Sequence, residues 1–136
     1  MRKNNIRGNL TYSKTQKLKS SKSIKQLFGE GSSFAHFPLR ILYMFQPADG
    51  LNLQTGFAVS AKNFKKAVDR NRIKRLMREA YRLQKNELED ILLKKVKRLE
   101  IFIIYTGVDL PGYTDIFNKT TFVIKKLNKI ANENIA

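Results

Sequence analysis

The sequence has no cysteine and only one histidine, His36, and these shortages exclude several kinds of chemistry. Without cysteine there is neither a disulfide nor a thiolate metal site, which is compatible with a reduced, cytoplasmic setting. A single histidine cannot provide a His-pair metal site or a two-histidine nuclease mechanism. His36 lies among Phe34, Phe37 and Pro38, where a structural or exposed imidazole is the expected role.

Acidic residues are also scarce, because 11 Asp and Glu face 27 Lys and Arg, for a net charge of +16. A small soluble domain has a net charge of magnitude about 2–8, so this excess predicts a polyanionic partner. The one acidic cluster, Glu87, Glu89 and Asp90, does not converge at helical spacing and predicts a solvated face. No phosphate-binding loop, dinucleotide fingerprint or zinc-protease motif is present. The sequence therefore predicts no catalytic site and no tightly bound metal within the protein.

Long hydrophobic runs are missing as well. The longest purely apolar runs are far shorter than the roughly 20 residues that cross a membrane. The N-terminus is basic but has no apolar run typical of a signal peptide. We therefore expect a nucleic-acid partner rather than a membrane, and nothing indicates an obligate protein partner.

The length of 136 residues and a hydrophobic content of 42% predict a single folded domain. Residues 1–17 contain five Lys and Arg and no acid, which predicts a basic, flexible arm. Residues 18–136 are expected to form the domain. Within it the patterns predict a short helix from Ser23, strands over 39–45 and 56–61, and a helix over 66–84. A further helical piece over 85–98, a strand over 99–106 and a helix over 114–130 follow.

Local signals support these boundaries. Ser23-Ile24-Lys25-Gln26 has the form of a capping box, and Gly29 and Gly31 predict the end of that helix. The strand over 39–45 is expected to form a hairpin with the strand over 56–61, through a turn at 48–50. One face of the first strand carries Leu39, Ile41, Tyr43 and Phe45, and the other carries Arg40, Leu42 and Met44. The strand over 99–106 is apolar on both faces, which predicts a central position.

The helix over 66–84 has two different faces. Helical spacing places Ile73, Leu76, Met77, Ala80 and Leu83 on a buried stripe, with Lys74, Arg75 and Arg78 opposite. Residues 62–82 contain nine basic and two acidic residues. The charges of these side chains do not alternate in sign, as they do in a solvent-exposed helix that is stabilised by ion pairs between successive turns. Because arginine matches phosphate in a bidentate manner, the window predicts nucleic-acid binding without choosing RNA over DNA.

Asn71, between Arg70 and Arg72, has three possible roles. It could contact a base edge or a 2′-hydroxyl, it could orient its neighbours, or it could bond the backbone near its own helix terminus.

These residues also resemble a known family. The pattern Ala67-Val68-x-Arg70-Asn71-Arg72-x-Lys74-Arg75-x-x-Arg78-Glu79 is similar to the RNR signature of the bacterial ribonuclease P protein subunit. The resemblance continues upstream through Phe57-Ala58-Val59-Ser60 and covers roughly Leu18 to Ile130. It implies an α+β fold, a two-layer α/β sandwich of order α-β-β-β-α-β-α. A left-handed β-α-β crossover, as in the second domain of ribosomal protein S5, is implied too.

The resemblance also implies a function. Residues 18–136 would be an RNA-binding domain whose partners are the ribonuclease P RNA and precursor tRNA. The protein would be the subunit that supports the endonucleolytic 5′ maturation of tRNA, while the RNA subunit holds Mg²⁺ and carries catalysis. The implied RNA-binding residues are Arg70, Asn71, Arg72, Lys74, Arg75 and Arg78, with Lys62, Lys65 and Lys66 in the preceding link. The implied cleft for the 5′ leader is lined by Phe28, Ile41 and Tyr43, with Lys74 and Arg78 at its edge.

Two other functions remain open at this level. One is a ribosome- or assembly-associated RNA-binding protein of the same fold. The other is a DNA-binding helix-turn-helix regulator, although no second short helix is predicted directly before the basic one. Phe28 also has a second reading, since a Phe beside Leu27 at helical spacing is as compatible with a core position as with a ligand contact.

Overall fold

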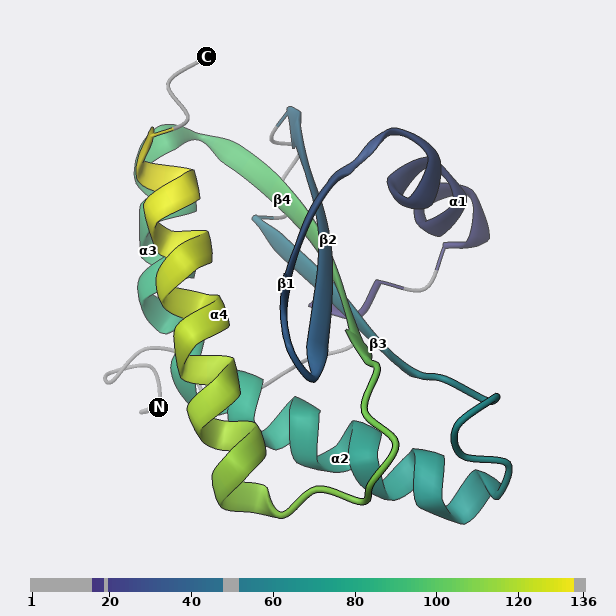
Figure 1. Ribbon diagram of the computed structural model, residues 1–136. Helices are drawn as coiled ribbons and strands as arrows, with labels where there is room; N and C mark the ends of the chain where they lie inside the picture. Colours follow the sequence, from purple (N-terminus) through teal and green to yellow (C-terminus); the bar gives the residue numbers. More distant parts are fainter. Residues whose placement is uncertain (1–15, 19, 48–51, 134–136) are drawn as a thin grey trace, which may run out of the picture.

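The computed structural model describes residues 16–18, 20–47 and 52–133, and Figure 1 shows its arrangement. The predicted turn at 48–50 and residues 1–15 of the predicted arm lie outside the described residues. The elements, in chain order, are α1 (Ser21–Glu30), β1 (Ser32–His36), β2 (Leu39–Pro47), β3 (Leu53–Val59), α2 (Ala67–Gln84), α3 (Asn86–Lys95), β4 (Lys97–Tyr105) and α4 (Tyr113–Glu133). This is the α+β class expected from the sequence, with the second helical piece present as α3.

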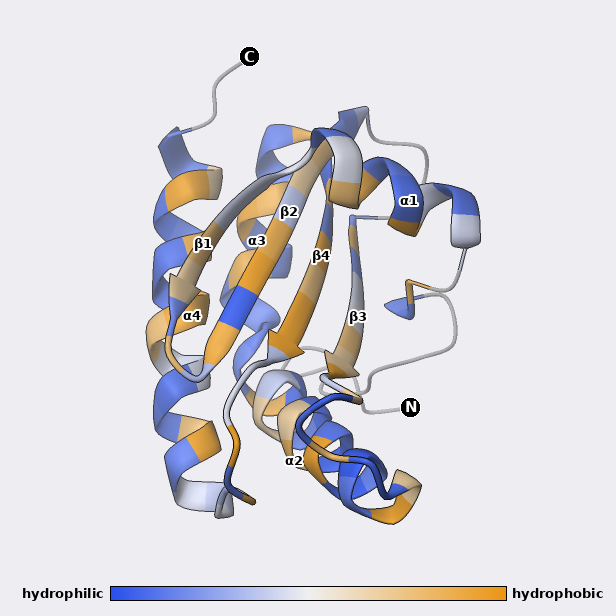
Figure 2. Cartoon of the chain, turned by 45° about the vertical axis from the view of Figure 1, so that its right-hand side comes forward, coloured by the Kyte–Doolittle hydropathy of each residue, from blue (hydrophilic) through white to orange (hydrophobic). Residues whose placement is uncertain are grey.

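The four strands form one sheet in the order β1-β2-β4-β3, which is visible in Figure 2. The predicted hairpin of β2 with β3 is therefore wrong. β4 lies between them, antiparallel to β2 and parallel to β3, and the hairpin is instead formed by β1 and β2. The predicted central position of the last strand is confirmed. Its apolar residues on both faces explain this, because a central strand is covered on both sides.

One face of the sheet, called here the covered face, packs against α2, α3 and α4. Leu39 and Ile41 of β2 and Ile101 of β4 are almost fully buried there, with Ile116 and Leu127 of α4. Burying one such side chain contributes about 1.5–3 kcal/mol. This face therefore carries most of the core, and it is the face that the pattern of β2 makes the more apolar.

The other face, called here the open face, has α1 as its helical cover (Figure 1). Its small core consists of Leu18, Leu27 and Leu42, with half-buried Met44 and Phe102 packed beside it. Gly56 of β3 allows the Phe102 ring to lie against the sheet. A Cβ at Gly56 would come within 2.6 Å of a ring carbon of Phe102. Residues toward the far end of β4, such as Ile104, remain half-exposed.

Helix α1 begins three residues earlier than the capping box predicts. Ser20 is the N-cap, and its hydroxyl accepts a hydrogen bond from the backbone N–H of Ser23 at 3.3 Å. Ser23 therefore donates its backbone N–H to the capping side chain and is not the N-cap itself. The predicted end is confirmed, because the N–H of Gly31 bonds the carbonyl of Leu27 at 2.9 Å.

Helix α2 matches its predicted bounds closely and its buried stripe in part. Ile73, Met77 and Ala80 are buried, whereas Leu76 is half-buried and Leu83 is exposed. Tyr81, on the opposite edge of the stripe from Leu83, is buried instead. Its ring is buried and its hydroxyl bonds the hydroxyl of Thr55 on β3 at 2.5 Å. The buried stripe is thus turned toward β3.

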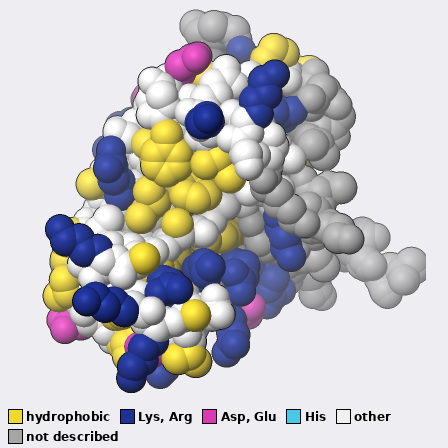
Figure 3. All heavy atoms as spheres, turned by 90° about the vertical axis from the view of Figure 1, so that its right-hand side faces the viewer, with side chains coloured by type: hydrophobic (Ala, Val, Ile, Leu, Met, Phe, Trp, Pro, Cys, Tyr) yellow, Lys and Arg dark blue, Asp and Glu magenta, His cyan; other side chains and the backbone are white. Residues whose placement is uncertain are grey.

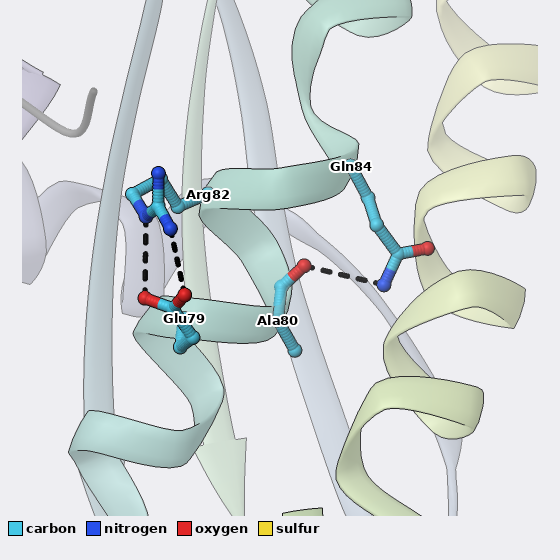
Figure 4. A network of polar contacts seen from close by, with 4 residues as sticks. All are labelled: Glu79, Ala80, Arg82 and Gln84. Carbon is cyan, nitrogen blue, oxygen red and sulfur yellow. Dashed lines mark hydrogen bonds and ion pairs between the residues drawn. The ribbon is translucent and has the colours of Figure 1, made fainter. Parts of the chain in front are cut away.

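Gln84 joins the end of α2 to α4. Its amide nitrogen donates to the carbonyls of Ala80 at 3.2 Å and Phe117 at 3.3 Å. Its amide oxygen accepts from the hydroxyl of Thr121 at 2.7 Å. Figure 4 shows the Gln84 side chain extending from α2 toward α4, on the side of the helix away from Arg82.

The segment before α1 lies beside β3 and α3. The N–H of Leu18 bonds the carbonyl of Thr55 at 3.1 Å, and Lys17 pairs with Thr55 in a parallel bridge. Gln16 donates to Glu89 at 2.7 Å, and Glu89 is also 3.1 Å from the buried ammonium group of Lys85. Lys17, which the sequence places in the arm, therefore lies against the sheet. The division at 17/18 stays a prediction.

Candidate nucleic-acid interface

The basic face of α2 is the first candidate surface. Within the described part of the chain, no side-chain hydrogen bond or ion pair engages Asn71, Arg72, Lys74, Arg75 or Arg78. Asn71 and Arg72 are exposed at the beginning of the helix, and Arg75 is exposed one turn later. Four cations and one amide thus point away from the core. The alternative in which the Asn71 side chain bonds its own backbone is not seen among the described residues.

Two arginines of the same window have protein partners. The guanidinium of Arg70 donates to the carbonyls of Phe64 at 2.7 Å and Lys65 at 2.8 Å, which holds the link before α2 in place. Arg82 pairs with Glu79 at 2.6 Å (Figure 4). The hydrogen bond to Arg82 lowers the pKa of Glu79, and the same bond raises the pKa of Arg82. Arg70 therefore has a structural task, whereas Arg72, Lys74, Arg75 and Arg78 remain available to a ligand.

Two hollows of about 260 and 270 Å³ lie where this face meets the segment before α1. Lys17 and Arg78 line both of them. Arg75, Glu79 and Arg82 complete the first. Lys74, Leu18, Thr55, Gly56 and Phe57 complete the second. Hollows with several cations suit phosphate groups, which arginine and lysine bind by charge-assisted hydrogen bonds.

The second candidate surface is the apolar part of the open face. Phe28 of α1 is 52% exposed and meets the ring of Phe102 edge to face, with ring centroids 5.5 Å apart. Phe102 lies over Gly56, which in turn lines the hollow that contains Lys74 and Arg78. Figure 3, which views this side of the molecule, shows hydrophobic side chains gathered in the middle with Lys and Arg on either side. An apolar, aromatic surface bordered by cations is the arrangement that binds single-stranded nucleic acid.

The five residues implied for the leader cleft do not line one surface. Phe28, Lys74 and Arg78 border the open face, but Ile41 is fully buried under the helices of the covered face. Tyr43 packs against the same core and lies 6.0 Å from Phe34, centroid to centroid. The structure therefore places Ile41 and Tyr43 on a different face of the sheet from Phe28, Lys74 and Arg78. The physical reason is that the face of β2 with four large apolar residues is the one that three helices cover.

Several residues of these surfaces were not identified from the sequence. On the open face they are Leu42, Met44, Gly56, Phe102 and Ile104, and at its basic edge Lys17. Leu42 and Met44 could have been found from the alternation of β2, since they share the less apolar face with Arg40. Phe102 had no such signal, because β4 is apolar on both faces. Lys17 depends on a pairing with β3 that no local pattern encodes.

The link between β3 and α2 is held mainly by its uncharged residues. Phe64 is buried, and the amide of Asn63 donates to the carbonyls of Thr106 at 3.3 Å and Gly107 at 3.2 Å. Lys62, Lys65 and Lys66 are exposed. Because the link leads directly into α2, its three ammonium groups extend the basic surface at the beginning of the helix.

Neither a metal site nor a membrane segment appears among the described residues. Between residues 16 and 133, leaving aside 19 and 48–51, no cluster of three or more His, Asp or Glu is placed to hold a metal ion. The same residues contain no helix with the length and apolar character of a membrane span. Helix α2 follows strand β3 rather than a short helix, so the basic helix is not the second helix of a helix-turn-helix unit.

Comparison with known proteins gives a consistent result. A family profile described as Ribonuclease P matches residues 12–128. The ribonuclease P protein component of Porphyromonas gingivalis is 35% identical over 105 residues, which are 76% of this chain and 77% of that protein. The component of Chlorobium phaeobacteroides is 43% identical over 75 residues, covering 52% of this chain and 51% of that protein.

A solved structure of the RNase P protein of Staphylococcus aureus has the same fold. It is 21% identical, with a TM-score of 0.64 over 82% of this chain and 94% of that one. The profile covers far more than half of the sequence, and the shared fold agrees with it. The chain therefore belongs to the ribonuclease P protein family, the RNA-binding protein component of the endoribonuclease that processes the 5′ end of tRNA.

Proposed function

We propose that the two candidate surfaces divide the RNA between them. The open face binds the single-stranded 5′ leader of precursor tRNA, and the basic face of α2 binds the ribonuclease P RNA. The observation that carries the first assignment is the exposed ring of Phe28 against Phe102, beside the hollow that holds Lys74 and Arg78. An unpaired base can stack on the aromatic pair while the adjoining phosphate reaches the cations.

The second assignment depends on charge. Arg72 and Arg75 point away from the core without a protein partner among the described residues, and Lys74 and Arg78 lie on the border that this surface shares with the open face. Lys62, Lys65 and Lys66 continue this surface before the helix. Arginine side chains bind phosphate in a bidentate manner, which suits a folded RNA whose backbone is exposed. Asn71, at the exposed beginning of the helix, would contact a 2′-hydroxyl or base edge of the same RNA.

Catalysis and metal binding are assigned to the RNA subunit. Glu79, a carboxylate that lines the first hollow, is engaged by Arg82. The protein's own contribution is to neutralise phosphates and to position the leader, which lets the RNA hold Mg²⁺ close to the scissile phosphate. The cytoplasmic setting expected from the absence of cysteine stays a prediction.

The test of the leader assignment uses the enzyme reconstituted with its RNA subunit. Phe28→Ala should reduce the preference for precursor over mature tRNA by about 1–3 kcal/mol, the usual contribution of one aromatic stacking contact. Its affinity for the RNA subunit should be unchanged. The matched control is Leu93→Ala, which removes another exposed apolar side chain, from α3.

A second variant separates this cleft from the one implied by the sequence. Tyr43→Ala should lower the free energy of unfolding and leave the preference for precursor tRNA unchanged, because Tyr43 packs on the covered face. The proposal is wrong if Tyr43→Ala lowers that preference in a fully folded enzyme while Phe28→Ala does not.

A further inference from the structure

A third surface lies where α4 crosses the edge strand β1. Two pairs of side chains meet there. The ring of His36 stacks on the ring of Phe122, with centroids 3.8 Å apart and planes inclined by 15°. The ammonium group of Lys126 lies 4.7 Å from the centroid of the Phe34 ring. Two residues of β1 thus meet two residues of α4, and the two segments run in opposite directions.

The spacing of the two elements explains the match. Phe34 and His36 are two residues apart on a strand, which separates them by about 6.7 Å. Phe122 and Lys126 are one helical turn apart, which separates them by about 6 Å along the axis. The two pairs therefore form side by side, and each holds the other in place. The resulting surface has a fixed geometry before any ligand arrives.

This surface is aromatic, exposed and positively charged. Phe122 is 47% exposed, although its ring is already stacked on His36, and Phe37 in the adjoining turn is 72% exposed. Between Asp115 and Glu133, helix α4 carries four lysines and no acid. Lys125, Lys126 and Lys129 are exposed and Lys119 is half-buried.

The position of the surface separates it from the other two. Helix α4 packs on the covered face, whereas the aromatic pair of Phe28 and Phe102 belongs to the open face. Figure 1 shows α4 and α1 on opposite sides of the sheet. A leader strand bound on the open face therefore does not reach Phe122, so an RNA segment that meets α4 comes from elsewhere in the complex.

We propose that the surface formed by His36, Phe122, Lys125, Lys126 and Lys129 binds an unpaired segment of the ribonuclease P RNA. A base stacks on Phe122, and the lysines neutralise the adjoining phosphates. The proposal depends on the RNA-binding function of the family. Charge complementarity favours RNA over a protein or a second copy of this chain, since four lysines without an acid would repel a second copy. The exposed aromatic ring favours unpaired over duplex RNA, because duplex bases are already stacked.

The absence of tryptophan from the sequence allows a direct test. Phe122→Trp places the one indole of the chain in the proposed site, where stacking of a base quenches its fluorescence. Adding the ribonuclease P RNA alone should cause saturable quenching, and subsequent precursor tRNA should cause no further change. Phe28→Trp should respond to precursor tRNA, and Leu93→Trp on α3 should respond to neither.

A double variant that removes two lysines, made in the Phe122→Trp background, tests the contribution of charge. Lys125→Ala with Lys129→Ala should weaken the RNA response and reduce its log–log salt slope by about 0.7 for each phosphate that is no longer neutralised. Lys94→Ala, an equally exposed lysine on α3, is the control and should change neither.

Three results would overturn the proposal. The first is no saturable quenching of Phe122→Trp by the ribonuclease P RNA while Phe28→Trp still responds to precursor tRNA, which leaves the proposed leader cleft intact. The second is quenching that requires precursor tRNA, which identifies a different RNA as the occupant. The third is equal quenching in Leu93→Trp, which indicates non-specific binding. Thermal unfolding of each variant confirms that it is folded.

Discussion

The two faces of the sheet use the same strands for opposite purposes. On the covered face, Ile41 and Ile101 are buried under α2, α3 and α4. On the open face, Leu42 and Phe102 are the neighbours of these residues in sequence, and α1 covers them only in part. Successive side chains of a strand alternate between faces, so one strand can supply both a core and a binding surface. The amount of helix packed on each face decides which of the two it becomes.

Helix α2 repeats this division around its own axis. Ile73 and Met77 are buried on the side toward the sheet, while Arg72 and Arg75 are exposed on the other. The basic side depends on the apolar side, because the burial of the latter holds the cations in a fixed arrangement. Stability and RNA binding should therefore respond to different residues of the same element.

The largest expected effect comes from a matched pair of isoleucines on adjacent strands. Ile41→Ala should lower the free energy of unfolding by about 2–5 kcal/mol, since it removes a fully buried side chain from the covered face. Ile104→Ala, at a half-buried position of the open face, should cost clearly less. Urea unfolding of both variants measures the difference. Equal losses would show that the two faces do not differ in packing as described.

The second effect comes from a matched pair of glycines. Gly56→Ala places a Cβ 2.6 Å from the Phe102 ring and should force that ring off the sheet. We expect a loss of about 1–3 kcal/mol in stability and a weaker preference for precursor tRNA. Gly29→Ala, which meets nothing within 4 Å inside α1, should be neutral or slightly stabilising. A Gly56→Ala enzyme with unchanged precursor preference would show that Phe102 does not contact the leader.

A third comparison separates ligand-facing from structural arginines in α2. Arg78→Ala should reduce the log–log salt slope of RNA binding by about 0.7–0.9 and leave stability almost unchanged. Arg70→Ala should instead lower stability, because the carbonyls of Phe64 and Lys65 lose their donor. RNA titrations at several salt concentrations, together with thermal unfolding, give both quantities. If Arg78→Ala lowers stability and Arg70→Ala lowers the salt slope, Arg78 is the structural residue and Arg70 the RNA contact.

The smallest effect concerns the ion pair of Glu79 and Arg82. Glu79→Gln removes a negative charge from the basic surface and should tighten RNA binding by about 0.2–1 kcal/mol at low salt. Since the pKa of Glu79 is lowered, the pair's small stabilisation is present above the usual carboxyl pKa. It is lost as the pH falls through the lowered value. The free energies of unfolding of wild type and Glu79→Gln, plotted against pH, should therefore converge at acidic pH. Curves that stay parallel would show that the ion pair does not contribute to stability.

Much of the fold could be predicted from local patterns. The bounds of α2, the central position of β4 and the two faces of β2 all follow from spacing and residue type. The start of α1 is predicted three residues late from the local pattern, because Ser20 and Ser23 are chemically equivalent candidates for the N-cap, and the structure uses Ser20. The β2–β3 hairpin was predicted wrongly, because proximity in sequence favours pairing unless a more apolar strand intervenes.

The sequence by itself determined that this protein has a basic helix with one apolar side, and that β2 has a strongly and a weakly apolar face. Both features are local, since they depend on the period of a helix or strand. Only the tertiary structure decided that Ile41 and Tyr43 face three helices while Phe28 meets Phe102. Only the tertiary structure also brought His36 against Phe122, and placed Lys17 and Arg78 around the same hollows. These contacts join residues far apart in the chain, and they depend on which strands pair and on which face each helix packs.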